Sequence, residues 1–164
     1  YLYNNYISAL PEEISQLKRL KSLTLIRNRL SELPRALNGL TELTMLDVRE
    51  NQLRELPEDW SGLAKLEQLW LAENRLAALP AGLGQCAALI GLYAGRNELT
   101  DVPQALGTLK KLKKLHLNDN KITDGSAVFT RMNWLRELNV SGNNLGFDKM
   151  MVIRQALTDT NIYF

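Results

Sequence analysis

The sequence is poor in several features that would assign it to a particular class of protein. It has one cysteine, Cys86, so no internal disulfide forms, which disfavours the disulfide-stapled design of many secreted repeat proteins. No apolar run approaches the roughly 20 residues of a membrane span, and no signal peptide is visible. The 20 basic and 18 acidic residues leave a net charge of +2 without long runs of one sign. Charge alone therefore indicates neither a nucleic acid nor an anionic membrane as partner.

What the sequence has instead is a strict internal period of 23 residues. Asparagine recurs at this step, at Asn5, Asn28, Asn51, Asn74, Asn97, Asn120 and Asn143, and proline recurs at Pro11, Pro34, Pro57, Pro80 and Pro103. Around each asparagine the pattern is LxxLxLxxNxL, as in LKSLTLIRNRL from Leu20, and most units continue with LPxxLxxL. Such a period predicts stacked units that share one core.

This pattern resembles the leucine-rich-repeat family across essentially the whole chain. The resemblance implies an α/β fold, a curved right-handed solenoid with a parallel sheet on its concave side and short helical or irregular returns on its convex side. Residues 1–145 are predicted to form the repeats, a partial first unit and then units that start at Leu20, Leu43, Leu66, Leu89, Leu112 and Leu135. Residues 146–164 are predicted to form a C-terminal cap helix and an edge strand, similar to the end of some bacterial members, so we expect a bacterial source.

The residues of one unit support the same architecture. The LxL alternation predicts a short strand whose leucines face inward, as Leu69 and Leu71 would. The repeated asparagine is expected to form a structural ladder, because its amide satisfies backbone groups of the buried turn. After the LP step, an apolar pair such as Ile14 and Leu17 suits one helical turn packed inward.

The two ends of the chain depart from the period. After Asn143 the apolar residues expected to be available for burial on the cap helix are Met151, Val152, Ile153, Ala156 and Leu157. At the other end, YLYNN enters in the middle of a strand, and an exposed strand edge is normally covered in native proteins. We therefore expect further repeats or a cap upstream, and a monomer unless that edge self-associates.

The sequence offers no catalytic constellation. The period places His116 outward on a strand and Cys86 at an inward position of a return segment, so the two do not form a nucleophile pair. A single histidine offers no metal site, since zinc needs three or four converging ligands. We predict that the segment is not an enzyme and binds neither cofactor nor metal.

Because the period is constant, the outward residues sort into columns along the sheet. The central column reads Thr24, Asp47, Trp70, Tyr93, His116 and Asn139. Three consecutive units thus place ring beside ring, about 4.8 Å apart. Gly91 and Gly95 flank Tyr93, so the ring faces are expected to be accessible, with a shallow dip beside Tyr93.

The charged columns predict pairs between neighbouring units. These are Arg27 with Glu50, Arg96 with Glu73 or Asp119, and Glu98 with Arg75 or Lys121. Asp47 and Arg49 have fewer partners in their own columns and are expected to meet a ligand. Nucleic acid would need a continuous basic stripe, which the columns lack.

These features predict a module that recognises a protein or peptide on the concave sheet. Trp70 and Tyr93 are expected to anchor the partner and His116 to extend the ridge, while Asp47, Arg49, Arg96 and Lys114 set its polarity. Three alternatives stay open: a purely structural aromatic stack, the targeting arm of a larger enzyme or effector, and a carbohydrate or small-ligand site on the ridge. Both a cytoplasmic location and delivery of a bacterial effector into a host fit the sequence.

Overall fold

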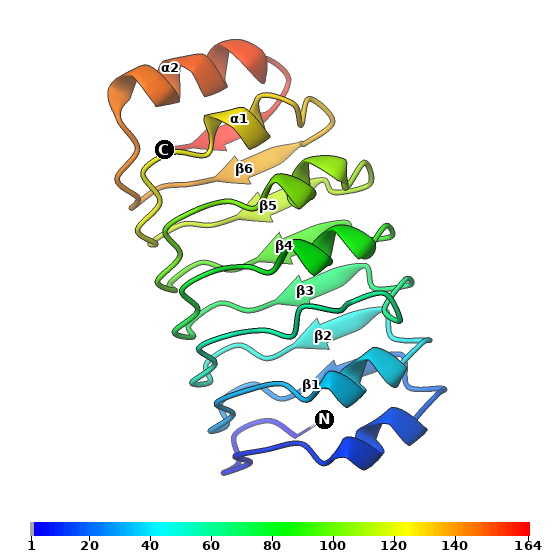
Figure 1. Cartoon of the computed structure of the whole chain (residues 1–164). Helices are drawn as coiled ribbons and strands as arrows, with labels where there is room; N and C mark the ends of the chain where they lie inside the picture. Colours follow the sequence, from blue (N-terminus) through cyan, green and yellow to red (C-terminus); the bar gives the residue numbers. More distant parts are fainter. Residues whose placement is uncertain (1) are drawn as a thin grey trace.

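The computed structural model describes residues 2–164 as one curved solenoid built around a seven-stranded parallel sheet (Figure 1). The strands follow one another in chain order: β1 Ser22–Thr24, β2 Met45–Asp47, β3 Gln68–Trp70, β4 Gly91–Tyr93, β5 Lys114–His116, β6 Glu137–Asn139 and β7 Asn161–Tyr163. From β1 to β6 each residue pairs with the one 23 positions later, as Leu46 does with Leu69. The predicted leucine-rich-repeat solenoid is therefore confirmed.

Short helical turns carry the chain back on the opposite side of the solenoid. They are η1 Glu12–Gln16, η2 Arg35–Gly39, η3 Ala81–Gln85, η4 Gln104–Thr108 and α1 Ser126–Phe129. Each of the four η segments directly follows a repeat proline, whose φ near −70° suits a helix start and whose missing N–H is not needed there.

The return between β2 and β3 has no helical turn. Trp60 stands at the position that Leu37 and Leu83 occupy in the neighbouring units, and its side chain is 1% exposed. Its indole N–H donates to the Pro57 carbonyl over 2.6 Å, and its backbone N–H donates to Gln85 Oε1 over 2.9 Å. A large buried ring thus replaces a turn of helix, a substitution that the repeat pattern did not indicate.

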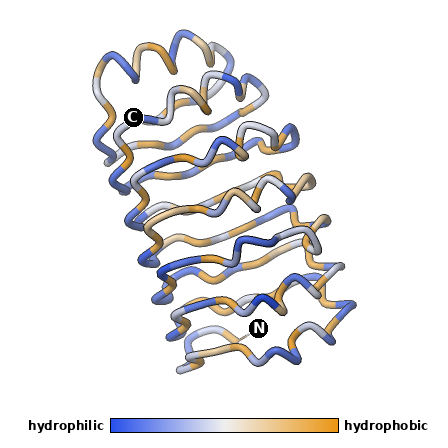
Figure 2. The backbone as a smooth tube through the Cα atoms, in the orientation of Figure 1, coloured by the Kyte–Doolittle hydropathy of each residue, from blue (hydrophilic) through white to orange (hydrophobic). Residues whose placement is uncertain are grey.

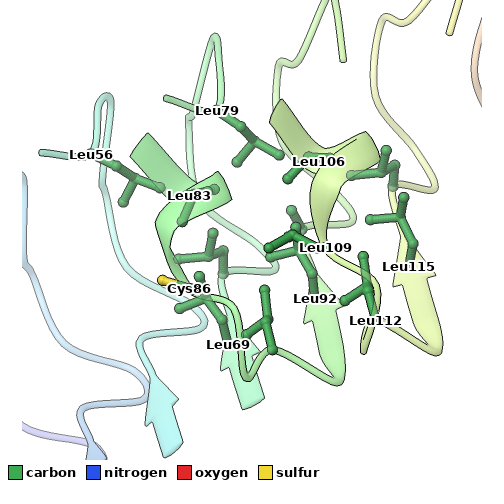
Figure 3. Close-up of a cluster of buried hydrophobic side chains, with 14 of the residues drawn as sticks. Leu56, Leu69, Leu79, Leu83, Cys86, Leu92, Leu106, Leu109, Leu112 and Leu115 are labelled. Atoms are coloured by element: carbon green, nitrogen blue, oxygen red, sulfur yellow. The ribbon is translucent and has the colours of Figure 1, made fainter. Parts of the chain in front are cut away.

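The core is a continuous column of leucines between the sheet and the returns (Figure 3). In Figure 2 the chain alternates between hydrophobic and hydrophilic segments in every unit, as the shared core requires. The inward strand residues Leu69 and Leu71 are fully buried, as predicted, and so is Cys86. Leu17 differs from the expected inward packing, because it lies in the first described unit, with a neighbour on one side only, and is 49% exposed.

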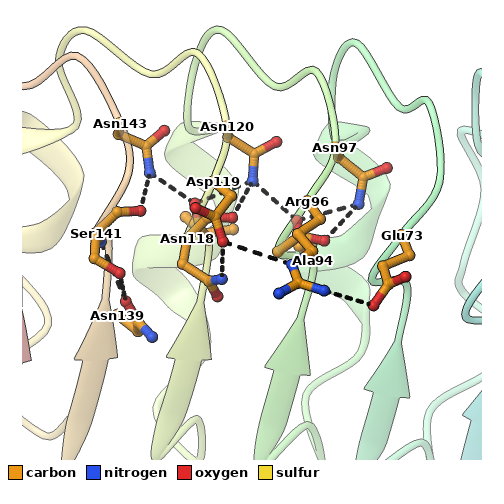
Figure 4. Close-up of polar contacts among 12 residues, drawn as sticks. Glu73, Ala94, Arg96, Asn97, Asn118, Asp119, Asn120, Asn139, Ser141 and Asn143 are labelled. Atoms are coloured by element: carbon orange, nitrogen blue, oxygen red, sulfur yellow. Dashed lines mark hydrogen bonds and ion pairs between the residues drawn. The ribbon is translucent and has the colours of Figure 1, made fainter.

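The repeated asparagines form a hydrogen-bonded ladder along one edge of the stack (Figure 4). The amide nitrogen of Asn74 donates to the carbonyls of Leu71 and Val48, and its Oδ1 accepts from the N–H of Leu53, each over 3.0 Å. The same three contacts recur at Asn28, Asn51, Asn97, Asn120 and Asn143. Asn5 differs, since within residues 2–164 its amide reaches only the Tyr3 carbonyl.

The residue before each ladder asparagine adopts a left-handed backbone conformation. The row consists of Asn4, Arg27, Glu50, Glu73, Arg96 and Asp119, with φ between 54° and 58°, and ends at Gly142 with φ 67°. Non-glycine residues rarely adopt positive φ, because Cβ approaches the following carbonyl. The turn into the asparagine ladder therefore imposes the same backbone strain in unit after unit.

The C-terminal segment contains the helix α2 Phe147–Ala156 and the strand β7, which pairs parallel to β6. Of the five apolar residues expected to be available for burial here, only Ile153 and Leu157 are buried. Met151, Val152 and Ala156 are exposed, because a helix presents only one face to the stack. Lys149 ties α2 to the turn before α1 through an ion pair of 2.8 Å with Asp124.

Candidate functional site

Strand pairing places the aromatic column where the period predicted it. Asp47 lies opposite Trp70, Trp70 opposite Tyr93, and Tyr93 opposite His116. Each of the three rings is half-buried, on the face of the sheet that does not cover the core. We call Trp70, Tyr93 and His116 the aromatic cluster.

The rings of the aromatic cluster pack on one another. Trp70 and Tyr93 stack with centroids 3.7 Å apart and planes 9° apart, and His116 meets Tyr93 edge-on at 5.0 Å. Arg49 lies 4.7 Å from the Trp70 ring, on the side away from Tyr93 because β2 and β4 flank β3 on opposite sides. The expectation of accessible ring faces is therefore wrong, since neighbouring rings on adjacent strands are close enough to stack. The cluster therefore presents mainly ring edges at the surface.

The expected dip beside Tyr93 is also filled. A Cβ placed on Gly91 would lie 2.8 Å from both Cε2 and the hydroxyl oxygen of Tyr93, so the tyrosine ring folds over that glycine. On the other side, a Cβ on Gly95 would lie 2.5 Å from Asn118 Oδ1. The small residues thus accommodate neighbouring side chains rather than a hollow.

Asp47 and Arg49 are not short of partners, contrary to the expectation from their columns. Arg49 Nη2 donates to Asp47 Oδ2 over 2.7 Å, and Arg49 Nε donates to Asp47 Oδ1 over 2.9 Å. Hydrogen bonding to Asp47 is the main cause that raises the pKa of Arg49. The column analysis compared neighbouring units and missed a pair two residues apart on one strand. Asp47 is 5% exposed, so Arg49 is the member of the pair that reaches solvent.

His116 and Lys114 converge on a carboxylate that the sequence prediction did not include in the site. His116 Nε2 lies 2.7 Å from Glu137 Oε1, and Lys114 Nζ lies 3.5 Å from Glu137 Oε2. Burial is the main cause that raises the pKa of Tyr93, while Lys114 lowers it and Glu137 raises it. Acidic and basic groups therefore border the aromatic cluster on its β5 and β6 side.

The central column continues one strand beyond its predicted end. Tyr163 of β7 lies opposite Asn139 and is 51% exposed. Asn139 and Tyr163 are 24 residues apart, so a fixed period of 23 could not place Tyr163 in the column. The resemblance predicted an edge strand within residues 146–164, but it did not place Tyr163 in the central column.

The outer charged row pairs much as expected. Arg96 Nη1 donates to Glu73 over 3.1 Å and lies 3.8 Å from Asp119 through Nε (Figure 4). Arg27 pairs with Glu50, and Glu98 pairs with Lys121 rather than with Arg75. Arg96 thus has two acidic partners and lies on the outer row rather than beside the rings.

Groups able to do chemistry do not converge on this face. Cys86 is buried in the core, and burial raises the pKa of its thiol to about 12, so it is inert as a nucleophile at neutral pH. No group of three or more histidine, cysteine, aspartate or glutamate side chains suited to a metal ion occurs within residues 2–164.

The comparison with protein families agrees with the repeated asparagine ladder and the parallel sheet. The leucine rich repeat model matches residues 1–53, 34–76 and 89–145, which together are more than half of the chain. The chain belongs to the leucine-rich-repeat family. Proteins of this fold, receptors and an internalin among them, are generally protein-binding modules.

Several solved leucine-rich-repeat structures are similar to the chain. An internalin from Listeria monocytogenes is 29% identical with a TM-score of 0.83, over 95% of this chain and 44% of the internalin. A Leptospira interrogans leucine-rich-repeat protein is 26% identical with a TM-score of 0.61, over 98% and 53%. The plant peptide hormone receptor RGFR1, solved in complex with RGF2, is 27% identical with a TM-score of 0.75, over 83% and 23%.

This leucine-rich-repeat chain spans about half or less of the length of these three proteins. No match was found among curated protein sequences. Within the described part of the chain, no helix has both the length and the apolar character to cross a membrane.

Proposed function

We propose that this leucine-rich-repeat segment binds a protein or peptide partner on its concave sheet, through the edges of the aromatic cluster. Trp70 and Tyr93 are the anchors, His116 extends the contact, and Arg49 supplies a cation at one end. Arg96 and Lys114 act at the polar border. Asp47 acts indirectly, since its carboxylate holds the Arg49 side chain in position.

The observation that carries this proposal is a continuous half-exposed run of side chains on the face that is not needed for the core. From Arg49 through Trp70 and Tyr93 to His116, each group contacts the next. Aromatic residues and arginine are the residue types most enriched in binding hot spots. Because the rings already hold one another, a partner that binds their edges would order few further side chains.

A displayed peptide library tests this proposal, because it samples a large number of candidate partner sequences at once. Peptides selected on the wild-type chain are expected to lose at least about ten-fold in affinity for the Trp70→Ala/Tyr93→Ala variant, since hot-spot truncations cost about 2 kcal/mol or more. Tyr163→Ala is the matched control. It removes a more exposed ring of the same column that does not contact the cluster, so binding should be retained.

Circular dichroism and urea unfolding must accompany these measurements, because the rings also contribute to stability. Retained affinity of the double variant for all selected peptides would contradict the proposal and leave the stack as a purely structural feature. A library that yields no binder above background would count against it equally.

Two other functions make different predictions. A carbohydrate site would use open ring faces, and the stacking of Trp70 on Tyr93 and Arg49 leaves few of them, so we expect no change in Trp70 fluorescence across a glycan panel. A role as the targeting arm of a larger enzyme would use the same recognition surface. This alternative therefore predicts the same binding residues and differs only in the larger protein to which the segment would belong.

A further inference from the structure

A cluster of basic side chains lies at the N-terminal ends of β5 and β6, beside the aromatic cluster. It consists of Lys110, Lys111 and Lys113 from the turn before β5, and Arg136 from the residue before β6, and we call it the basic patch. The backbone N–H of Arg136 donates to the Lys113 carbonyl over 2.9 Å, so the two units are directly adjacent. Lys110, Lys111 and Arg136 are exposed, and Lys113 is half-buried.

Two of the lysines are held in place by one residue, Trp134. Lys110 Nζ lies 3.6 Å from the centroid of the Trp134 ring, and Lys113 Nζ donates to the Trp134 carbonyl over 3.2 Å. A cation over an indole keeps its charge while its flexible stem is ordered. The patch thus has part of its positive charge fixed before any partner arrives, which reduces the entropy lost on binding.

The patch departs from the charge pattern of the rest of the solenoid. The equivalent cations four units earlier, Lys18, Arg19 and Lys21, have an acidic residue, Glu42, at a flanking position of the next unit. On this same edge Glu42 pairs with Lys65 at 2.6 Å. The positions that flank the three lysines in the adjoining units are Ala87, Ala88 and Ile90 on one side, and Asn133, Trp134 and Arg136 on the other.

No carboxylate lies within 4.0 Å of the four cations anywhere in residues 2–164. Lys113 and Arg136 occupy matching positions in adjacent units, where like charges repel each other. Glu137 borders the patch, but His116 and Lys114 already contact its two oxygens.

We propose that the basic patch binds an acidic segment of the protein partner, a short run of aspartate and glutamate side chains. This inference rests on the proposed function, because Lys114 and His116 of β5 join the patch to Tyr93 and so form one path for a bound chain. An acidic peptide fits better than nucleic acid, which needs a longer basic stripe. The patch spans only two neighbouring units, and Glu137 follows Arg136 directly at its border.

Charge reversal with a fluorescent polyglutamate peptide of about ten residues tests the proposal. The variant Lys110→Glu/Lys111→Glu/Lys113→Glu is compared with Lys18→Glu/Arg19→Glu/Lys21→Glu, which changes the same three repeat positions four units earlier by the same charge. At about 50 mM salt the patch variant should bind at least about ten-fold more weakly than wild type, and the control less than about two-fold more weakly. A milder variant, Lys110→Gln/Lys111→Gln/Lys113→Gln, guards against misfolding and should show an intermediate loss.

Three results would overturn the proposal: absence of wild-type binding to the peptide at low salt, equal losses in the two charge-reversed variants, or tighter binding of a single-stranded oligonucleotide or of phosphatidylserine vesicles than of the peptide. The Trp70→Ala/Tyr93→Ala variant separates this proposal from the function proposed above. It keeps the basic patch and should still bind polyglutamate while it loses the library-selected peptides.

Discussion

Trp70 stacks on Tyr93 at 3.7 Å while Arg49 covers the other face of the indole at 4.7 Å. The pair therefore contributes to the stability of the sheet as well as to the surface that we propose as the binding site. A double-mutant cycle of Trp70→Ala and Tyr93→Ala should give a coupling energy of about 0.5 to 1.5 kcal/mol in urea unfolding. A coupling near zero would mean that the two rings do not hold each other in solution.

The buried ring of Trp60, in the return between β2 and β3, should matter far more for stability than the half-buried aromatic cluster. Trp60→Ala removes a side chain that is 1% exposed and leaves a cavity where the neighbouring units have leucine. We expect a loss of about 3 to 5 kcal/mol in the free energy of unfolding, measured by urea denaturation. Trp60→Leu restores the residue type of the neighbouring units and should recover part of that loss. An equal loss in both variants would show that filling the cavity is not what matters.

Substitution of a ladder asparagine should reduce stability most where a repeat unit is present on both sides of it. Asn74→Ala leaves the buried N–H of Leu53 without its side-chain acceptor. The carbonyls of Val48 and Leu71 each lose one of two amide donors, since Asn51 and Asn97 still donate to them. The expected loss is about 1 to 3 kcal/mol in the free energy of unfolding. Asn5→Ala removes an exposed contact to the Tyr3 carbonyl, the one side-chain hydrogen bond of Asn5 among the described residues. It is the matched control and should change stability little. Similar losses at the two positions would contradict the ladder as the cause.

At the positive-φ residues before the ladder asparagines, we expect a glycine variant to be more stable than an alanine variant, the reverse of the usual order. At Glu73, with φ 58°, the glycine variant should be more stable than the alanine variant by about 1 kcal/mol, because only alanine has a Cβ to strain that backbone. The same two substitutions at exposed Gln52, where φ is not positive, should favour alanine. Thermal unfolding of the four variants measures both differences, and the same order at both sites would show that the strain is not significant.

The reactivity of the buried Cys86 thiol measures whether neighbouring repeats separate in the native state. Burial raises the pKa of its thiol to about 12, so at pH about 8 almost no thiolate forms in the folded chain. A thiol reagent is expected to modify Cys86 only after denaturant unfolds the stack. Rapid modification without denaturant would show that the units around Cys86 separate under native conditions.

The strand register could be predicted from the period of 23 residues because β1 to β6 all keep that spacing. This is why the register of Trp70 on Tyr93 could be predicted without coordinates. Side-chain rotamers do not follow from a period, so whether the rings stacked or stood apart could not be predicted. The pair of Asp47 with Arg49 was missed because it forms within one strand, and Tyr163 because the last unit adds one residue to the step.

The ion pair between Asp124 and Lys149 should make the attachment of α2 dependent on pH. Hydrogen bonds from Lys149 and then from Ser126 lower the pKa of Asp124 in the folded chain below its usual range. A lowered folded pKa gives stability that is present above the unfolded pKa of about 4 and is lost as the pH falls toward the folded pKa. Lys149→Met should therefore reduce stability at pH about 7 more than at pH about 2, so that the two proteins converge in acid. Hydrogen exchange of the α2 amides at both pH values measures this locally. A difference between wild type and variant that stays constant with pH would show that Lys149 acts through packing instead of through the Asp124 carboxylate.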